Sequence, residues 1–253
     1  MIKVEHLSLS YRQGRRQEPI HVIDNLSLDV AEGESLAIIG PSGCGKSSFL
    51  YILAGLMRPT SGLINITGEE VRRPRRDVAL AQQDAGLLPW KTVWKNATLS
   101  LKFNGRAQGK SALEAAYRRV RATLSDLGLD GLEHRYPAQL SGGQIKRVAI
   151  ARALAAGPRV LLMDEPLVSL DAFTRERIQE MILKLWQRQR FTMVLVTHEM
   201  EEAAFLGQRI VVLTPRPATI KEIIENPRMG QSGWRESEDY YQQVRRVRLL
   251  CES

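Results

Sequence analysis

The sequence predicts an α/β fold: a mainly parallel, doubly wound sheet with an N-terminal antiparallel β subdomain and an inserted α-helical subdomain. Two half-buried strands are expected in the N-terminal part, because apolar and polar residues alternate over 2–11 and 22–30. Short apolar runs such as 160–163 and 193–196 are expected to be buried strands, and helical patterns separate them. The helical subdomain is expected where residues 84–156 become mostly helical in pattern.

The N-terminal half contains a strand, a loop and a helix in immediate succession. Residues 35–39 are apolar and lead directly into a glycine-rich segment. A helix is expected behind that segment over 46–56, where apolar residues recur with helical spacing. Residues 62–67 return to the alternation of a strand.

Two longer helices are expected in the helical part. Ser111 and Glu114 fit a capping box, which opens a helix that ends near Gly128. A second helix is expected to begin at Ser141 and to end before Gly157.

The strand pattern then resumes at 160–163, 191–197 and 210–213. Between the first two strands lies a helix whose apolar face includes Trp186, and this tryptophan is expected to pack in the core. The last residues are loosely patterned, with one expected helix over 236–250.

Composition narrows the class of protein without choosing a function. The 253 residues are 43% hydrophobic and 25% charged, as in ordinary globular proteins, and the formal net charge is +8. This charge favours an anionic partner, for which nucleotide, nucleic acid and acidic lipid all qualify. Cys44 and Cys251 offer neither a metal-binding spacing nor a disulfide framework, which favours a reducing compartment. No apolar run approaches the ~20 residues of a membrane-spanning helix, so action on a membrane would require a partner.

Residues 40–47 read GPSGCGKS, which matches the phosphate-loop pattern G-x-x-x-x-G-K-[ST] between a strand and a helix. The glycines allow backbone N–H groups to turn inward around phosphate oxygens, and the start of the helix adds a positive end. Lys46 is expected near the β- and γ-phosphates, the Ser47 hydroxyl is placed to coordinate Mg²⁺, and Cys44 is expected to be inert. The loop predicts a P-loop NTPase, a class that also includes kinases and GTPases. The expected nucleotide-binding residues here are Gly40, Pro41, Ser42, Gly43, Cys44, Gly45, Lys46, Ser47 and Ser48.

A pair of carboxylates follows a later strand. Residues 160–166 read VLLMDEP, so Asp164 and Glu165 emerge at the carboxyl end of an apolar strand, where α/β sheets bind ligands. Asp164 is expected to hold Mg²⁺ through water. Glu165 is expected to polarise the water that attacks the γ-phosphate in line.

Residues 140–144 read LSGGQ. The serine is expected to cap a helix, and the two glycines leave backbone amides unshielded at its start, which makes an anion site. With these residues the chain resembles the ATPase family of ABC transporters, whose hallmark is LSGGQ, over about residues 1–220. The resemblance implies that ATP is held between the phosphate loop of one copy and the LSGGQ residues of another. The residues of this second group are Ser141, Gly142, Gly143 and Gln144.

The resemblance also implies roles for residues elsewhere. Tyr11 matches the aromatic residue that stacks on adenine, although a tyrosine on an N-terminal strand can also be plain packing. His198, in VLVTHE, matches the histidine that contacts the γ-phosphate. Asp171, in VSLDA, matches the aspartate of the inter-subunit loop. Val168 departs from the small residue that the family usually has three positions before this aspartate.

Gln83 matches the family's glutamine that reaches Mg²⁺ and the attacking water and senses the membrane partner. Gln82 is the rival, but the following LLPW sets the register at Gln83. The segment LLPWKTVWKNA at 87–97 resembles the nitrate/sulfonate/taurine importer group. TPRPATI at 214–220 resembles that group's S-P-R-P-G-R-I, with two departures. The two tryptophans of 87–97 form either a groove for a permease helix or local packing.

The resemblance therefore implies an ATPase subunit that energises a membrane importer for nitrate, sulfonate, taurine or a related small solute. It implies ATP and Mg²⁺ as ligands. The implied partners are a second copy or a homologous ATPase subunit, integral membrane permease subunits and, indirectly, an extracytoplasmic solute-binding protein, with no nucleic acid. The implied location is the cytoplasmic face of a bacterial inner membrane, bound peripherally. The alternative is a soluble ABC ATPase of the iron–sulfur assembly type, which LLPW and the R-P element disfavour.

The expected domain organisation follows the same resemblance. An ATPase domain over 1–220 would comprise a catalytic core, at 1–83 and 158–215, and a helical subdomain at 84–157. Residues 216–253 would form a short C-terminal tail.

Overall fold

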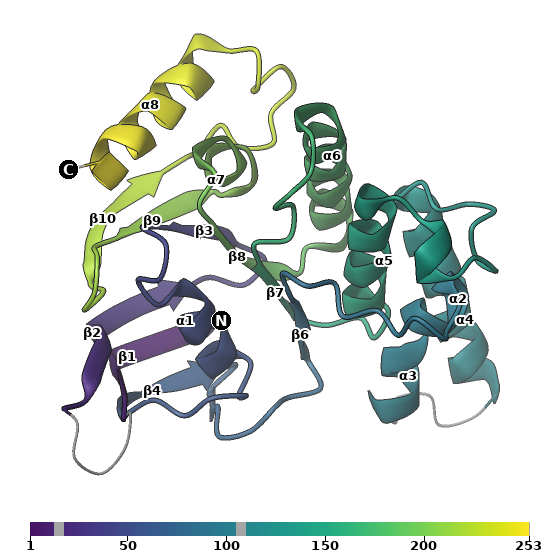
Figure 1. Ribbon diagram of the computed structural model, residues 1–253, viewed down its shortest axis with the longest axis horizontal. Coiled ribbons are helices and arrows are strands. Elements are labelled where there is room, and N and C mark those ends of the chain that lie inside the picture. The colour runs from purple at the N-terminus through teal and green to yellow at the C-terminus, as the bar shows by residue number, and fades with distance from the viewer. Residues whose placement is uncertain (13–17, 105–109, 253) are drawn as a thin grey trace. The chain divides into compact units, whose positions relative to one another are not determined.

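The structure is a computed structural model that describes residues 1–12, 18–104 and 110–252 (Figure 1). The chain divides into two compact units. The first unit comprises Met1–Arg75 and Phe191–Ser253, and the second comprises Arg76–Arg190. The predicted domain borders at 84 and 157 remain a prediction.

An antiparallel sheet forms the N-terminal part of the first unit, with the strand order β2-β1-β4-β5. Strands β1 (Ile2–Tyr11) and β2 (Ile20–Val30) form the alternating segments that the sequence predicts. Buried residues mostly alternate with exposed or half-buried ones along these strands, because successive side chains point to opposite faces of a sheet. The alternation is interrupted between Val4 and Leu7, where the register shifts, and at the adjacent buried residues Val22 and Ile23. Strands β4 (Ser61–Ile66) and β5 (Glu69–Glu70) complete the sheet.

A second, mainly parallel group of strands in the first unit has the order β10-β9-β3-β8. Strand β3 (Ser35–Ile39) lies between and parallel to β8 (Thr192–Thr197) and β9 (Arg209–Leu213). All residues of β3 and β8 are buried, as expected of strands covered on both faces. Strand β10 (Ile220–Glu225) pairs antiparallel with β9 at the edge.

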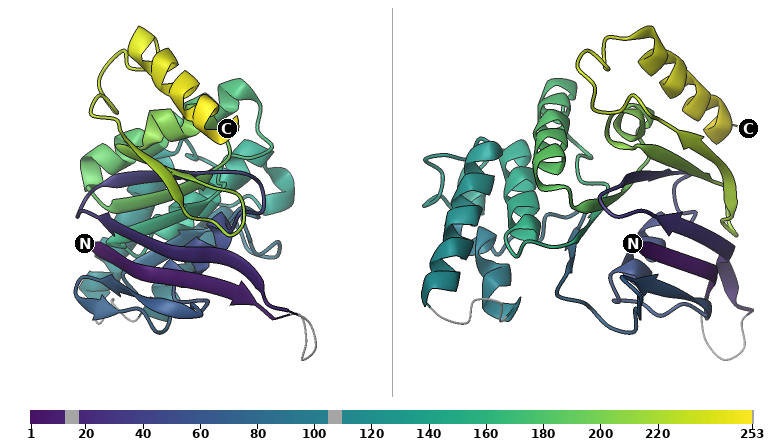
Figure 2. Two further views of the ribbon diagram at one scale, coloured as in Figure 1. Left: turned by 90° about the vertical axis from the view of Figure 1, so that its left-hand side faces the viewer. Right: turned by 180° about the vertical axis from the view of Figure 1, so that it is seen from behind.

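Helices cover both faces of these strands. Helix α1 (Lys46–Leu53) lies on one face, and α7 (Met200–Leu206) and α8 (Glu238–Glu252) lie on the other (Figures 1 and 2). Segment 226–252 is attached to α7 by hydrogen bonds. Trp234 Nε1 donates to the Ala204 carbonyl oxygen at 3.1 Å, and the Tyr240 hydroxyl donates to the Glu201 carbonyl oxygen at 3.1 Å. The C-terminal part is therefore folded onto the first unit.

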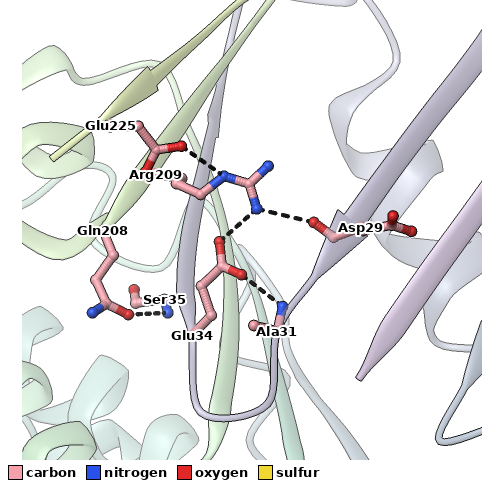
Figure 3. A network of polar contacts seen from close by, with 7 residues as sticks. All are labelled: Asp29, Ala31, Glu34, Ser35, Gln208, Arg209 and Glu225. Carbon is pink, nitrogen blue, oxygen red and sulfur yellow. Dashed lines mark hydrogen bonds and ion pairs between the residues drawn. The ribbon is translucent and has the colours of Figure 1, made fainter. Parts of the chain in front are cut away.

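A polar network joins the beginnings of β3 and β9 in the first unit (Figure 3). Arg209 Nη1 donates to Glu34 Oε1 at 2.9 Å and to the Asp29 carbonyl oxygen at 3.0 Å, while Nε lies 3.4 Å from Glu225 Oε1. The second oxygen of Glu34 accepts a hydrogen bond from the Ala31 N–H at 2.6 Å. Because Glu34 is only 8% exposed, its charge depends on these partners for stabilisation.

Replacing Arg209 with Met is therefore expected to lower the free energy of unfolding by about 2–3 kcal/mol, because the buried Glu34 carboxylate loses its cation. Arg246→Met is the matched control, since Arg246 pairs with Glu222 at the surface and should contribute within about 1 kcal/mol. Urea denaturation followed by circular dichroism measures the free energy of unfolding of both variants. Equal losses in the two variants would contradict the assignment of Arg209 to a buried network.

The second unit contains two parallel strands and most of the helices. Strands β6 (Val78–Ala81) and β7 (Val160–Asp164) pair parallel and in register. Its helices are α2 (Val93–Ala97), α3 (Leu99–Asn104), α4 (Lys110–Asp126), the 3₁₀ turn η1 (Pro137–Gln139), α5 (Gly142–Leu154) and α6 (Ala172–Gln189). In α6, Trp186 is 3% exposed, which confirms that it packs in the core.

The predicted α/β fold, with parallel strands, an N-terminal antiparallel sheet and a helical insertion, is confirmed. The patterns did not predict β6 or β10, and the predicted helix over 46–56 ends at Leu53. Ser111 lies inside α4 rather than at its cap. Over the described ranges, no helix is both long and apolar enough to cross a membrane.

Candidate functional site

The phosphate loop lies between β3 and α1 in the first unit. Gly43 and Gly45 have φ angles of +76° and +123°, which residues with a Cβ rarely adopt. A Cβ on Gly45 would also lie 2.8 Å from Val22 Cγ1. The backbone conformation therefore favours glycine at both positions, and close packing on β2 also requires it at Gly45.

Lys46 occupies the first position of α1 and is 5% exposed. Its Nζ donates to the carbonyl oxygens of Gly40 at 2.8 Å and Pro41 at 3.0 Å, so the ammonium group lies across the loop. These partners are uncharged, so the ammonium keeps its positive charge available to an anion. A buried cation beside a helix N-terminus fits a bound phosphate chain.

His198 and the phosphate loop emerge at the same edge of the sheet. Strand β8 is parallel to β3, and Thr197 lies opposite Ile39. Gly40 follows Ile39 and His198 follows Thr197, so both leave adjacent strands at their carboxyl ends, where α/β sheets bind ligands. His198 therefore lies at the same sheet edge as the phosphate loop, and its contact with the γ-phosphate remains a prediction.

Tyr11 lies beside the helix that follows the phosphate loop. Its hydroxyl lies 3.0 Å from Ser48 Oγ and 3.4 Å from Met57 Sδ. The side chain is 39% exposed, so it both packs on the α1 region and presents part of its ring to solvent. Stacking on adenine remains a prediction.

Cys44 is 2% exposed, and burial raises the pKa of its thiol. A higher pKa lowers the fraction of thiolate, which is the reactive form. The structure therefore supports the prediction that Cys44 is an inert loop residue.

In the second unit, β6 and β7 bring two groups of predicted residues to one edge. Ala81 lies opposite Met163 on the paired strand. Gln82 and Gln83, which follow β6, therefore leave the sheet at the same edge as Asp164, the last residue of β7, and Glu165, which follows it. Asp164 is 2% exposed, whereas both glutamines are exposed. Glu165 has a φ of +45°, a left-handed conformation that is uncommon for residues other than glycine and is found at functional sites.

The LSGGQ residues form the tip of α5, as predicted. Ser141 is the N-cap: its Oγ accepts a hydrogen bond from the Gln144 N–H at 3.3 Å, and Gln144 Oε1 accepts one from the Ser141 N–H at 2.8 Å. Gly142 and Gly143 are the first two helical residues, so their N–H groups belong to the end that attracts anions.

The tip of α5 packs closely on the start of α6. A Cβ on Gly143 would lie 2.6 Å from Thr174 Cγ2, which excludes any larger residue without rearrangement. Asp171 caps α6 by accepting a hydrogen bond from the Thr174 N–H at 2.9 Å, and this bond lowers the pKa of Asp171. Phe173, beside Asp171, is 87% exposed. The second unit thus presents a helix tip, a carboxylate and an aromatic side chain close together.

Helix α5 also holds the loop that carries Gln83, a connection the sequence did not reveal. Lys146 Nζ donates to the Gln83 carbonyl oxygen. Arg152 donates to the carbonyl oxygens of Ala85 at 2.6 Å and Gly86 at 2.7 Å. The helix that begins with LSGGQ is therefore tied at two points to the backbone of residues 83–86.

The two tryptophans of residues 87–97 have different environments. Trp94 packs against Tyr117, with ring centroids 5.5 Å apart, and Arg121 lies 5.4 Å from its ring centre, so Trp94 is local packing. Trp90 is 70% exposed. The buried Asn96 holds the backbone at Leu88 in place. Its side-chain amide donates to the Leu88 carbonyl oxygen at 3.1 Å and accepts from the Leu88 N–H at 2.8 Å.

Each unit therefore carries one part of the expected site. The first unit holds residues 40–48 and His198 at one sheet edge, with Tyr11 beside α1. The second unit holds the Gln83 loop with Asp164 and Glu165 at one edge, and the α5 tip with Asp171. The oxygens expected to bind Mg²⁺ are divided in the same way, with Ser47 in the first unit and Gln83 and Asp164 in the second.

Comparisons with known proteins identify the family. Residues 23–168 match the family described as ABC transporter. An uncharacterised ABC transporter ATP-binding protein of Methanocaldococcus jannaschii is 44% identical over 225 residues, which is 88% of this chain and 81% of the relative. The taurine import ATP-binding protein of Pseudomonas fluorescens is 41% identical over 222 residues, 88% of this chain and 81% of the relative. The aliphatic sulfonates import ATP-binding protein of Bacillus cereus is 40% identical over 207 residues, which is 82% of this chain and 79% of the relative.

Solved structures agree with these relatives. A dimeric ATP-binding cassette in a post-hydrolysis state, bound to ADP and Pi, is 33% identical, with a TM-score of 0.78 and coverage of 89% of this chain and 98% of that chain. A dimeric structure of a bacterial ABC transporter cassette is 34% identical, with a TM-score of 0.78 and the same coverage of 89% and 98%. The chain therefore belongs to the ABC transporter family and is one of its ATP-binding, ATP-hydrolysing cassettes.

Proposed function

We propose that the chain is the ATP-hydrolysing subunit of a membrane importer, peripherally bound at the cytoplasmic face of a bacterial inner membrane. The solute would be taurine, another sulfonate, nitrate or a related small molecule. The observation that carries the proposal is that two helix N-termini, at Lys46 and at Ser141, are suited to binding anions, in a chain with relatives named as taurine and aliphatic sulfonates import ATP-binding proteins. The permease subunits, and through them a solute-binding protein, would be its partners.

Pairing with a second copy follows from the chemistry of the two tips. The phosphate loop provides a cradle and a cation for one side of a triphosphate, and the α5 tip provides the N–H groups of Gly142 and Gly143 for another. If each ATP lies between the loop of one copy and the α5 tip of the other, neither copy has a complete site alone. Phe173, exposed beside Asp171, supports a contact surface next to that tip.

The division of labour in hydrolysis follows from residue chemistry. Lys46 and the loop amides would stabilise charge on the phosphates, and Glu165 would accept a proton from the attacking water. His198 would contact the γ-phosphate from the end of β8, and Gln83 would orient the water. Ser47, Gln83 and Asp164 offer oxygen ligands that would hold Mg²⁺, whose positive charge would offset the negative charge of the phosphates.

Coupling to the membrane would run through the Gln83 loop. Lys146 and Arg152 attach this loop to α5, so a displacement of the α5 tip on ATP binding is transmitted to residues 83–86. The exposed Trp90 lies four residues beyond Gly86 and offers an apolar contact for a permease helix.

The test is to purify the tagged chain in detergent from the membranes of its native cells and to place the complex in proteoliposomes. We expect polytopic membrane subunits to co-purify, and taurine or an alkanesulfonate, supplied with the solute-binding protein, to raise ATP hydrolysis several-fold. Nitrate serves as the second candidate solute. Recovery of the chain without any membrane protein, together with ATP hydrolysis indifferent to all these solutes, would contradict the proposal.

A further inference from the structure

The turn between β9 and β10, residues 214–219, lies against the outside of the phosphate loop in the first unit. The turn is internally fixed, because the Thr214 N–H donates to the Thr219 carbonyl oxygen at 3.0 Å and the Thr219 N–H donates to Thr214 Oγ1 at 2.9 Å. The two threonine hydroxyls also lie 3.1 Å apart. The hydrogen bonds between Thr214 and Thr219 therefore close the turn and hold residues 215–218 between them.

The same turn is anchored to β2, the strand on which the phosphate loop packs. The Ala218 N–H donates to the Val22 carbonyl oxygen at 2.8 Å, and the Asp24 N–H donates to the Ala218 carbonyl oxygen at 3.0 Å. Ala218 is completely buried. Because Gly45 approaches Val22 so closely that a Cβ would not fit, one stretch of β2 supports both the turn and the loop.

Leu213, the last residue of β9, and Arg216, within the turn, contact the loop directly. A Cβ on Gly40 would lie 3.1 Å from both the Cβ and the carbonyl oxygen of Leu213. Arg216 Nε donates a hydrogen bond to the Gly43 carbonyl oxygen, and one Nη lies 3.4 Å from the position of a Gly43 Cβ. The Arg216 guanidinium therefore packs against the backbone of Gly43, whose φ angle lies in the left-handed region.

This contact has a consequence for the inside of the loop. The C=O and N–H groups of a trans peptide point in opposite directions. When Arg216 holds the Gly43 carbonyl oxygen outward, the Cys44 N–H points inward, where it donates to the Pro41 carbonyl oxygen at 3.2 Å. The hydrogen bond between Cys44 and Pro41 closes a turn within the loop. The N–H groups of residues 45–47 follow this turn and lead into the start of α1.

We propose that Arg216 is a positioning residue for nucleotide binding, whose guanidinium holds the phosphate loop from outside in the conformation that accepts phosphates. The proposal rests on the loop binding ATP, and it is independent of the solute and of the membrane partner. Arg216 acts on loop geometry, so its effect is the same for ATP and ADP, and the rate of hydrolysis at saturating ATP does not depend on it.

The experiment measures the binding of fluorescent ATP and ADP analogues to the purified full-length chain, together with kcat and KM for ATP. Arg216→Met is expected to raise Kd for both nucleotides, and KM, about tenfold, because a charge-assisted hydrogen bond no longer holds the loop. The value of kcat is expected to stay within about twofold. Arg216→Lys keeps a charged donor and is expected to recover part of the affinity, and Arg246→Met, on the exposed face of α8, is the control.

Hydrogen exchange of the nucleotide-free protein separates positioning from a general loss of stability. Faster exchange confined to the amides of residues 43–47 in Arg216→Met supports the proposal. Unchanged Kd values, or a fall in melting temperature with exchange raised throughout the first unit, would overturn it. A loss of affinity for ATP but not for ADP would also overturn it, since Arg216 would then contact the γ-phosphate itself.

Discussion

Replacing Glu165 with Gln is expected to lower the rate of ATP hydrolysis about 10²- to 10⁴-fold, while the affinity for ATP changes by no more than about twofold. The amide has nearly the shape of the carboxylate but cannot accept a proton from water. Binding is spared because the phosphate contacts come from Lys46 and the loop amides, which the substitution leaves intact. Steady-state phosphate release and equilibrium binding of a fluorescent ATP analogue measure the two quantities.

The backbone at Glu165 makes Gln the most informative substitution. With a φ of +45°, the residue has a conformation in which further changes of side chain could alter the local fold, and the Glu→Gln change minimises that risk. Glu180→Gln, on the exposed surface of α6, is the matched control and should hydrolyse ATP at the original rate. Turnover by Glu165→Gln at more than a tenth of the original rate would exclude Glu165 as the base.

Replacing Ser141 with Arg is expected to lower hydrolysis about 10²- to 10³-fold, which is the size of effect seen when a group that stabilises transition-state charge is removed. The long side chain would cover the N–H groups of Gly142 and Gly143 and prevent the α5 tip from approaching a phosphate. Each copy should still bind ATP through its own loop. Equilibrium binding that persists while phosphate release stops is therefore the expected result.

The control for Ser141→Arg must account for the lost helix cap. Thr92→Ala removes a cap of the same geometry, because Thr92 Oγ1 accepts a hydrogen bond from the Lys95 N–H at 3.3 Å in the same unit. Either loss should cost about 1 kcal/mol of helix stability, and only Ser141→Arg should stop hydrolysis in the isolated chain. An equal loss of hydrolysis in both variants would mean that Ser141 acts only by stabilising the fold.

Local patterns predicted the elements that carry the site, and the structure shows why. The alternation in β1 and β2, the apolar runs of β3, β7 and β8, and the cap at Ser141 are all encoded within a few residues. Strand β6 was not predicted because its four residues, VALA, are too short to establish a period. Strand β10 was not predicted because IKEIIE fits a helix as well as an edge strand.

The contacts that hold the loops were not predictable by the same means. Lys146, Arg152 and Arg216 each donate to backbone carbonyl oxygens distant in sequence. A carbonyl oxygen is present at every residue, so such a contact leaves no pattern of residue types, and the sequence showed only that the chain is basic. The segment TPRPATI resembles the importer group, but nothing in its sequence indicates that Arg216 lies against Gly43.

The central claim is that one γ-phosphate is shared between the Lys46 loop of one copy and the Ser141 tip of another. Analytical ultracentrifugation of the Glu165→Gln chain tests this most directly. With saturating Mg-ATP it should sediment as two copies, with ADP as one, and the Glu165→Gln/Ser141→Arg chain should remain a single copy although it binds ATP. If Glu165→Gln stays a single copy with Mg-ATP even beside its membrane subunits, or if the double variant pairs equally well, the shared site does not exist.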